Sequence, residues 1–348
     1  MKKVYKRILR SLENLAINVD KKKVYMYEKF AIMKKRKLYS HIKWSKEQKK
    51  EFTSYWKKNY GKKISSRWHK LYEAANGVHC VEYFPEILYS AKLEYMLNDF
   101  KYAYVFANKS FNSVLFNDKM DGVRVPKTFL FKNKGQYFDS NRNLISEKDA
   151  MNIASNVGFA VIKPTVDSSS GRDVKVVNIQ NGKNARNGEE LEQLFRSYGD
   201  NFIVQERINQ HHQLSYLYPS SVNTVRMISY MCDNAVHTTP ISLRIGGGGS
   251  EVDNIHAGGM SIAVSDEGFL SKYAYRLGYG DSFEKFDLHP NTNVVFDGYR
   301  LDFIPKMIEV AKKLHLVMSN LGMISWDFTV DADGDIIVVE ANLKGQST

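Results

Sequence analysis

Two apolar strands joined by a short polar turn, close to the end of the 348-residue chain, constrain its fold most. Residues 324–330 and 335–342 are rich in Ile, Val, Phe and Trp, and an Asp-Ala-Asp-Gly turn at 331–334 separates them. Runs of this kind bounded by turn residues predict a β-hairpin. Because the second run is apolar on both faces, we expect the hairpin to lie inside a sheet, with Trp326 and Phe328 in the core.

The polar side chains of this hairpin indicate a cation site. An even-numbered turn pairs residue 327 with residue 338. Because side chains alternate along a strand, Asp327, Glu340 and Asn342 then share one face. Asp327 and Glu340 become diagonal neighbours about 7–8 Å apart at Cα, a separation that lets two carboxylates hold Mg²⁺ between them. A surface hairpin with a solvated polar face is the alternative, but the apolar second strand favours burial, and a buried carboxylate needs a cation.

A lysine near the end of another apolar strand, at 159–164, indicates an anion site. Lys163 needs an anionic partner if that strand is buried. The loop that follows offers backbone N–H groups and hydroxyls that can cradle phosphate. Its candidate residues are Ser168, Ser169, Ser170 and Gly171. No Gly-Lys-Ser/Thr closes the loop, so it is not a Walker motif, and a plain hairpin with a polar turn is an equal alternative on these residues alone.

The sequence Asn-Ile-His-Ala-Gly-Gly at 254–259 is a third candidate segment. Its paired glycines permit close approach of the backbone to a ligand. His256 alone is more often a hydrogen-bonded structural histidine than a catalytic one. The four glycines at 246–249 lack a following Lys-Ser/Thr and predict a loop.

Secondary-structure patterns divide the chain into two parts. Apolar residues at helical spacing predict helices in four early segments: 4–19, 24–37, 45–76 and 85–97. Strand-like runs follow, with helices between them: 102–106, 128–131, 158–163, 174–179, 202–206, 224–231, 237–245 and 260–264. We therefore expect an α+β protein in which a helical module at 1–104 precedes a mixed domain at 105–348.

Charge is concentrated in the helical module. The chain carries a net charge of +12, but residues 1–70 hold 23 Lys and Arg against 5 Asp and Glu, so the remainder is slightly acidic. Nucleic acid is therefore not expected as the partner of the whole chain. The basic segment at 1–70 predicts peripheral contact with an anionic membrane or with an acidic glycan, and a solvated helix face is an equal alternative.

Composition also indicates the cellular compartment in which the protein is expected. Two cysteines, Cys80 and Cys232, can build neither a disulfide framework nor a cysteine-based zinc site. No run approaches the roughly 18–20 apolar residues of a membrane span, and no signal-peptide core follows the first residues. These features predict a cytoplasmic protein, with the inner face of the membrane as its expected peripheral contact.

Taken in order, the motifs resemble those of the ATP-grasp superfamily, and most closely of the sugar-transfer-associated ATP-grasp family. The segments that carry the resemblance are Asn108-Lys109, Ile162-Lys163-Pro164, Ser168 to Gly171, Val204 to Ile208, Ser221 to Arg226, 254–259 and Asp327…Glu340-Ala341-Asn342. The resemblance implies two α/β subdomains that clamp ATP, with a lid subdomain at about 127–206. The usual N-terminal α/β domain is not evident, because helices stand in its place.

The resemblance also implies a role for each motif. Lys109, Lys163 and the Ser168–Gly171 loop would hold the ATP phosphates. The adenine hinge would be formed by Gln205, Glu206, Arg207 and Ile208. Two Mg²⁺ ions would be bound by Asp327, Glu340 and Asn342. The catalytic set would be Arg226, Arg244 and His256, with an arginine steadying the phosphoryl group during transfer.

The activity implied is that of an ADP-forming carboxylate–amine ligase, in which ATP converts a carboxylate into an acylphosphate that an amine then attacks. The sugar-transfer resemblance points to a sugar acid and an amino acid as substrates in bacterial polysaccharide biosynthesis. Two alternatives stay open: a kinase of the same fold that phosphorylates a hydroxyl of a small molecule or glycan, and a non-catalytic basic binding protein.

Overall fold

The computed structural model describes residues 2–166, 173–253, 258–277 and 282–344, with backbone alone at 2–10 and at 277. The chain divides into two compact units. The first comprises Met1–Phe100, Leu277–Glu284 and Lys344–Thr348, and the second comprises Lys101–Arg276 and Lys285–Leu343. Between residues 2 and 100 the named elements are helices, whereas strands dominate the second unit, so the expected α+β class is confirmed.

The first unit is built around aromatic side chains. Its helices are α1 (Lys2–Lys34), α2 (Arg36–Tyr39), α3 (Lys46–Tyr60), α4 (Arg67–Asn76), α5 (Glu86–Leu88), a π-helical turn (Tyr89–Leu93) and α6 (Glu94–Leu97). The helices predicted over 4–19 and 24–37 are one continuous helix up to Lys34. A Ser45 capping box starts α3 and left-handed Gly61 ends it. Trp44 packs with Phe52 and Trp56 of α3 in one apolar cluster.

Three acidic side chains lie in the interior of this unit. Glu28 and Glu94 are buried, and Glu86 is largely so, with Ser90 donating a hydrogen bond to its carboxylate at 2.9 Å. Burial, reinforced by the charges of Glu28 and Glu94, raises the pKa of Glu86 from 4.5 to about 7, although Ser90 opposes the shift. The carboxyl group is therefore half protonated near neutral pH.

This raised pKa predicts a pH-dependent stability. The folded state binds a proton at Glu86 that the unfolded state releases above 4.5, so this contribution is complete below 4.5 and is lost as pH rises through about 7. Between acidic and mildly alkaline pH the wild type should therefore lose about 3 kcal/mol of unfolding free energy that Glu86→Gln keeps. Urea titrations at both pH values measure the difference, with exposed Glu82→Gln as control. An equal effect of pH on the wild type and Glu86→Gln would contradict the assignment.

The larger sheet of the second unit is mostly antiparallel. Its order is β1-β16-β15-β9-β11-β12-β13-β14, with β10 paired to β9. The strands are β1 (Val123–Arg124), β9 (Thr224–Cys232), β10 (Ala235–Thr238), β11 (Ile241–Ile245), β12 (Met260–Val264), β13 (Leu270–Leu277), β14 (Phe283–Phe286), β15 (Met323–Val330) and β16 (Ile336–Asn342). Trp326 and Phe328 are fully buried in the core, as predicted.

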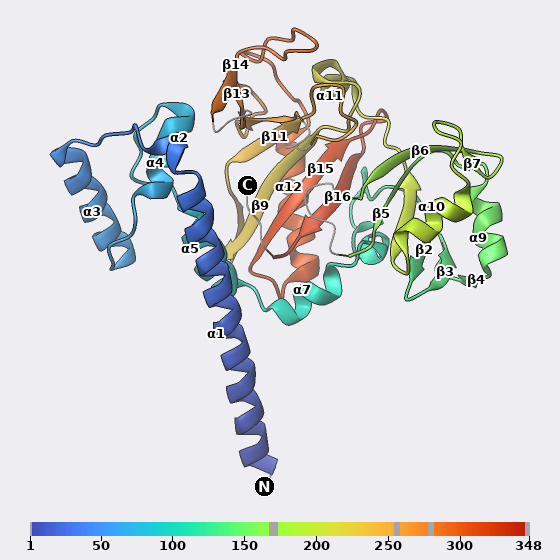
Figure 1. The fold of residues 1–348 in the computed structure, drawn as a ribbon, viewed down its shortest axis with the longest axis horizontal. Coiled ribbons are helices and arrows are strands. Elements are labelled where there is room, and N and C mark those ends of the chain that lie inside the picture. Colours follow the sequence, from blue (N-terminus) through green and yellow to red (C-terminus); the bar gives the residue numbers. More distant parts are fainter. Residues whose placement is uncertain (1, 167–172, 254–257, 278–281, 345–348) are drawn as a thin grey trace. The chain divides into compact units, whose positions relative to one another are not determined.

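Helix α12 (Ile304–His315) covers the apolar face of this sheet (Figure 1). The Trp326 indole donates to the Ser229 hydroxyl at 2.7 Å, and that hydroxyl lies 2.6 Å from Nδ1 of His315 at the end of the helix. Odd-numbered residues of β9 therefore face α12, and even-numbered residues face away from it. The opposite face of the sheet is left for polar side chains.

The smaller sheet lies entirely within residues 128–206, the segment predicted to form a lid. Its order is β4-β3-β2-β8-β5-β6-β7, with α9 (Glu147–Ala154) and α10 (Leu191–Tyr198) packed against it (Figure 1). The strands are β2 (Thr128–Asn133), β3 (Gln136–Asp139), β4 (Leu144–Ile145), β5 (Gly158–Pro164), β6 (Lys175–Gln180), β7 (Lys183–Asn184) and β8 (Phe202–Glu206). Central β8 is buried up to Glu206, and in β5 Ala160, Ile162 and Lys163 are buried, so the Lys163 side chain lies inside the protein.

Two predicted strands differ in the structure. The run at 102–106 is part of α7 (Phe100–Phe106), because Ala103 alone is buried there and a helix places it inward. The predicted strand at 237–245 is interrupted at Thr239 and Pro240, since proline cannot donate a ladder hydrogen bond. Among the described helices, none is both long and apolar enough to cross a membrane.

Candidate functional site

A row of directly paired residues crosses four strands on the polar face of the larger sheet. Asp327 lies opposite Glu340 of β16 and opposite Arg226 of β9, and Arg226 lies opposite Ser242 of β11. Directly paired residues of antiparallel strands project to the same face. The sheet register therefore brings together two carboxylates and a guanidinium that are up to 114 positions apart in the chain.

The register corrects the sequence prediction for the hairpin. Asp327 pairs with Glu340 itself, and not with residue 338. Five residues separate Val330 from its partner Ile336, and an irregularity at β16 shifts the register once more between Asp327 and Phe328. Asp327 and Glu340 are consequently direct neighbours across the strands, a closer arrangement than the predicted diagonal one.

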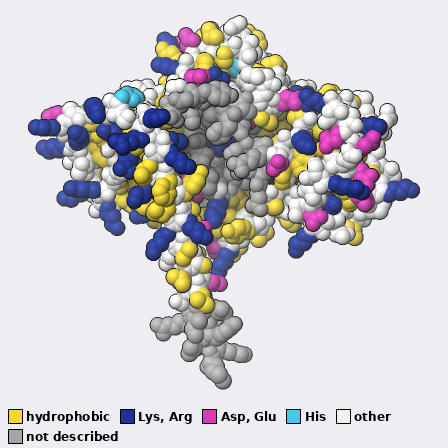
Figure 2. Space-filling model, in the orientation of Figure 1, with side chains coloured by type: hydrophobic (Ala, Val, Ile, Leu, Met, Phe, Trp, Pro, Cys, Tyr) yellow, Lys and Arg dark blue, Asp and Glu magenta, His cyan; other side chains and the backbone are white. Residues whose placement is uncertain are grey.

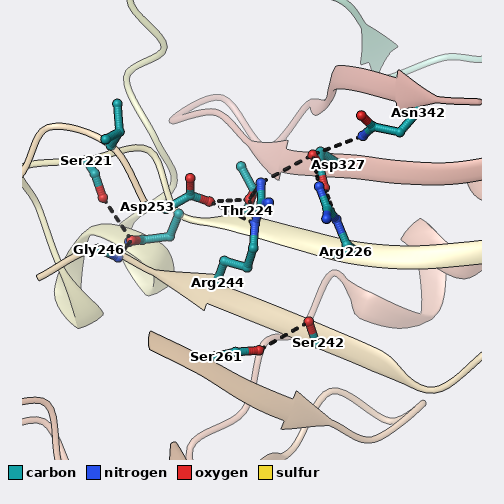
Figure 3. A network of polar contacts seen from close by, with 12 residues as sticks. Ser221, Thr224, Arg226, Ser242, Arg244, Gly246, Asp253, Ser261, Asp327 and Asn342 are labelled. Atoms are coloured by element: carbon teal, nitrogen blue, oxygen red, sulfur yellow. Dashed lines mark hydrogen bonds and ion pairs between the residues drawn. The ribbon is translucent and has the colours of Figure 1, made fainter. Parts of the chain in front are cut away.

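Asp327 is the centre of a hydrogen-bonded network (Figure 3). Arg226 binds it with two parallel hydrogen bonds, from Nε to Oδ1 at 2.8 Å and from Nη2 to Oδ2 at 2.7 Å. Arg244 Nη2 and Asn342 Nδ2 each donate to Oδ2 at 3.2 Å. Burial tends to raise the pKa of Asp327, which is 2% exposed, but Arg244 and Arg226 outweigh it and hold the pKa below its usual value. Asp327 is therefore an anion at neutral pH.

Thr224 and Asp253 complete the network, and neither was identified from the sequence. Arg244 lies opposite Thr224 in the sheet and donates to its hydroxyl from Nε and Nη2 at 3.1 and 2.9 Å. The Thr224 hydroxyl in turn donates to the Asp253 carboxylate, which lies 3.4 Å from Arg244 Nε. Burial raises the pKa of Asp253, with Asp327 adding to the shift and Arg244 opposing it. The two-residue spacing of Thr224 and Arg226 on one strand was the available signal.

Two lysines approach this row from outside the larger sheet. Lys109, in a short 3-10 turn (Lys109–Phe111), is 7% exposed and forms an ion pair of 2.9 Å with Glu340. Its backbone N–H donates to the Thr165 carbonyl at 2.8 Å, directly beyond the end of β5. The same strand carries Lys163, so the predicted lysine pair is brought to one place.

The ammonium group of Lys163 is buried and has no hydrogen bond or ion pair with any other residue in the described ranges. Burial, together with the neighbouring charge of Lys109, lowers its pKa to about 8, although Glu340 opposes the shift. A buried ammonium group next to a second cation favours an anionic ligand. This is the strongest indication of a phosphate site in the described structure.

The predicted hinge residues are engaged in contacts within the protein. Gln205 donates to the Pro126 carbonyl and to the Thr128 hydroxyl, both at 3.2 Å. Glu206 forms an ion pair with Arg124 and accepts a hydrogen bond of 2.8 Å from the backbone N–H of Lys127.

Arg124 of β1, which was not identified from the sequence, joins Glu206 to the larger sheet. Its second terminal nitrogen lies 2.7 Å from the carboxylate of Asp331, which follows β15, so Arg124 bridges two carboxylates that are far apart in the chain. Arg207 donates to the Ser220 carbonyl at 3.4 Å and stacks over Phe159, and Ile208 is half-buried. The role of these side chains in adenine binding stays a prediction.

Five predicted site residues lie outside the described residues: Ser168, Ser169, Ser170, Gly171 and His256. Their roles in phosphate binding and catalysis stay predictions. The residues that border them are described, and Asp253 and Thr165 both lie in the charged region set out above.

The donor set suits a hard cation that shares its coordination with phosphate. Asp327, Glu340 and Asn342 present oxygen atoms from neighbouring positions of one hairpin, and Mg²⁺ prefers oxygen ligands. Among the described residues, no three His, Cys, Asp or Glu side chains cluster as an all-protein metal site. Mg²⁺ is commonly held by one or two carboxylates together with substrate phosphates, and this arrangement fits that pattern.

Comparison with known proteins gives one family and a set of distant structures. Residues 88–348 match the family model described as sugar-transfer associated ATP-grasp. A comparison with functionally curated proteins gives no significant match.

The similar solved structures include the D-Ala:D-Ser ligase VanG of Enterococcus faecalis, at 16% identity and a TM-score of 0.41 over 71% of this chain and 55% of that one. Another is the L-amino acid ligase of Bacillus licheniformis, at 12% identity and a TM-score of 0.36 over 79% of this chain and 46% of that one. This chain thus spans about half of the length of these proteins.

Proposed function

Because the chain belongs to the sugar-transfer-associated ATP-grasp family, we propose that it is an ATP- and Mg²⁺-dependent carboxylate–amine ligase that forms an amide bond and releases ADP and phosphate. The family's association with sugar transfer supports a sugar acid as the carboxylate substrate and an amino acid or another amine as the acceptor. Bacterial polysaccharide biosynthesis is the proposed setting.

The observation that carries this proposal is the charge arrangement of the polar face. Lys109, Lys163, Arg226 and Arg244 supply four cations beside three carboxylates, and Lys163 is buried without an anionic partner in the described ranges. Such a site attracts a polyanion. The hairpin carboxylates beside it suit the divalent cation that accompanies a nucleoside triphosphate.

Each residue has a task in the proposed reaction. Bound MgATP supplies an activated γ-phosphoryl group and neutralises charge on it. Lys109 and Lys163 hold the phosphate oxygens from the side of the smaller sheet. Arg226 and Arg244 project from the larger sheet and stabilise the negative charge that develops when the phosphoryl group passes to the substrate carboxylate. The resulting acylphosphate has a good leaving group, so that an amine displaces phosphate and forms the amide.

Substrate-dependent ATP cleavage tests this function. The purified chain with MgATP should release phosphate when a sugar acid and an amine are supplied together, and should release it much more slowly when either is omitted. A panel of sugar acids crossed with amino acids, read by phosphate release and mass spectrometry, identifies the pair. A product whose mass contains phosphate would show transfer to a hydroxyl and contradict the ligase assignment. EDTA should remove the activity, because the proposed reaction requires Mg²⁺.

A further inference from the structure

Helix α1 packs on the first unit through one face only. On that face Ile32 and Glu28 are buried. The Asp20 carboxylate accepts hydrogen bonds from the Tyr95 hydroxyl at 2.5 Å and from Lys344 at 2.9 Å. These contacts fix the rotation of the helix about its axis, and so determine which side chains point away from the unit.

The opposite face of α1 carries a stripe of exposed apolar side chains. The stripe residues are Leu12, Leu15, Val19, Met26, Phe30 and Met33, each between 43% and 60% exposed. Their spacings of three, four and seven place them within an arc of about 60° and along about 30 Å of the helix. Exposed apolar residues are common singly, but a continuous line of them indicates a surface that is covered by something else.

Lysines border this stripe on both sides. At 100° per residue, Lys22 and Lys29 lie along one edge, and Lys23 and Lys34 lie along the other. All four are exposed, whereas Asp20 and Glu28 point to the packed face. Figure 2 shows hydrophobic and basic side chains next to one another on the described part of this helix. The covering surface must therefore be apolar in its interior and anionic at its boundary.

We propose that α1 lies in the interface of an anionic lipid bilayer, with the stripe among the acyl chains and the four lysines at the lipid phosphates. A helix with an apolar face and a lysine-rich border binds a membrane surface in this way, without crossing the bilayer. The lysine stems can extend along the apolar region while their ammonium groups reach the headgroups.

A second copy of the chain fits the stripe less well. Leu12, Val19, Met26 and Met33 repeat every seven residues, as the first core position of a coiled coil does. Leu15 would then occupy the second core position, but Lys22 and Lys29 follow it there, so two layers of the seam would bury like charges. Nucleic acid would pair with the lysines and leave the apolar stripe exposed.

Vesicle flotation of the full chain tests the proposal. We expect binding to vesicles of phosphatidylcholine mixed with phosphatidylglycerol, and little binding to phosphatidylcholine alone. Leu15→Ser together with Phe30→Ser should weaken binding at least about tenfold. Tyr27→Ser removes an aromatic residue outside the stripe that is even more exposed than Phe30, and should change binding less than about twofold. Circular dichroism checks that each variant keeps its helices.

The lysines are tested separately. Replacing Lys22, Lys23, Lys29 and Lys34 by Gln should weaken binding roughly fivefold for each lysine. The matched control replaces four exposed lysines of α3 by Gln: Lys49, Lys50, Lys57 and Lys58. Added salt should weaken binding of the wild type. The proposal is overturned if the wild type ignores anionic vesicles, if the Leu15/Phe30 variant binds as well as the wild type, or if light scattering shows a dimer that this variant dissociates. ATP turnover is measured in parallel, so that a failure of the membrane proposal can be distinguished from a failure of the ligase assignment.

Discussion

Glu340→Gln loses ATP turnover by at least about a thousandfold, and Asp327→Asn does the same. Both substitutions preserve side-chain shape and remove the negative charge that the proposed Mg²⁺ site requires. Turnover is measured as phosphate release with the substrate pair found in the panel. Ser242→Ala is the matched control, because Ser242 lies in the same cross-strand row, opposite Arg226, but carries no charge. We expect it to keep turnover within about threefold.

The two variants differ in stability, and this difference identifies the better test. Asp327 is buried between Arg226 and Arg244, so its neutralisation removes the carboxylate that Arg226 binds with two hydrogen bonds and one of the two carboxylates beside Arg244, and costs roughly 3–5 kcal/mol of unfolding free energy. The Glu340 side chain is 28% exposed, so Glu340→Gln should cost much less. A folded Glu340→Gln protein with full turnover would refute the assignment of Glu340.

Lys163→Met should weaken ATP binding by about a hundredfold and at the same time stabilise the free protein. The first effect follows from losing a cation that faces the phosphates. The second follows because the lowered pKa of Lys163 means that its charge is unfavourable in the folded state, by roughly 3 kcal/mol at neutral pH. Calorimetric titration with ATP and thermal unfolding without ligand measure the two effects.

Lys109→Met provides the comparison, since Lys109 has a partner. Its removal leaves the Glu340 carboxylate unpaired, so this variant should lose both ATP binding and stability. Lys163→Met protein that is less stable than the wild type and binds ATP normally would contradict our interpretation of the buried ammonium group.

The lowered pKa of Lys163 also predicts how ATP affinity and stability change with pH. The group loses its proton as pH rises through about 8, so ATP affinity should fall across that range in the wild type. In the same range the free protein should gain stability up to the ordinary lysine pKa, because the unfolded chain keeps the proton longer. Lys163→Met should lack both dependences.

Local sequence predicted the kind of each element better than its pairing. The terminal hairpin was predictable because its apolar residues and its turn are adjacent in the chain. The register of the hairpin could not be predicted, because no residue type in β16 indicates the irregularity there. Residues 102–106 have strand propensity and are helical, since the tertiary environment buries Ala103 alone.

The site shows the same limit. Asp327, Glu340 and Lys163 stood out because charged residues in apolar strands need partners. Thr224, Asp253 and Arg124 are ordinary surface residue types, and only the cross-strand register and the packing of distant segments give them a role. Sequence patterns report burial along one strand, whereas a partner on another strand depends on the whole fold.

The Asp327 carboxylate occupies the two arginines that an incoming anion would bind, so it competes with that anion for them. A lone oxyanion must displace it from Arg226 and Arg244, and a lone cation must displace both arginines from it. A ligand that brings cation and anion together can replace all of these contacts at once. The metal ion would bind the Asp327 carboxylate, and the phosphate would bind the two guanidinium groups. We therefore expect nucleotide and Mg²⁺ to bind with positive thermodynamic coupling, so that each raises the affinity for the other.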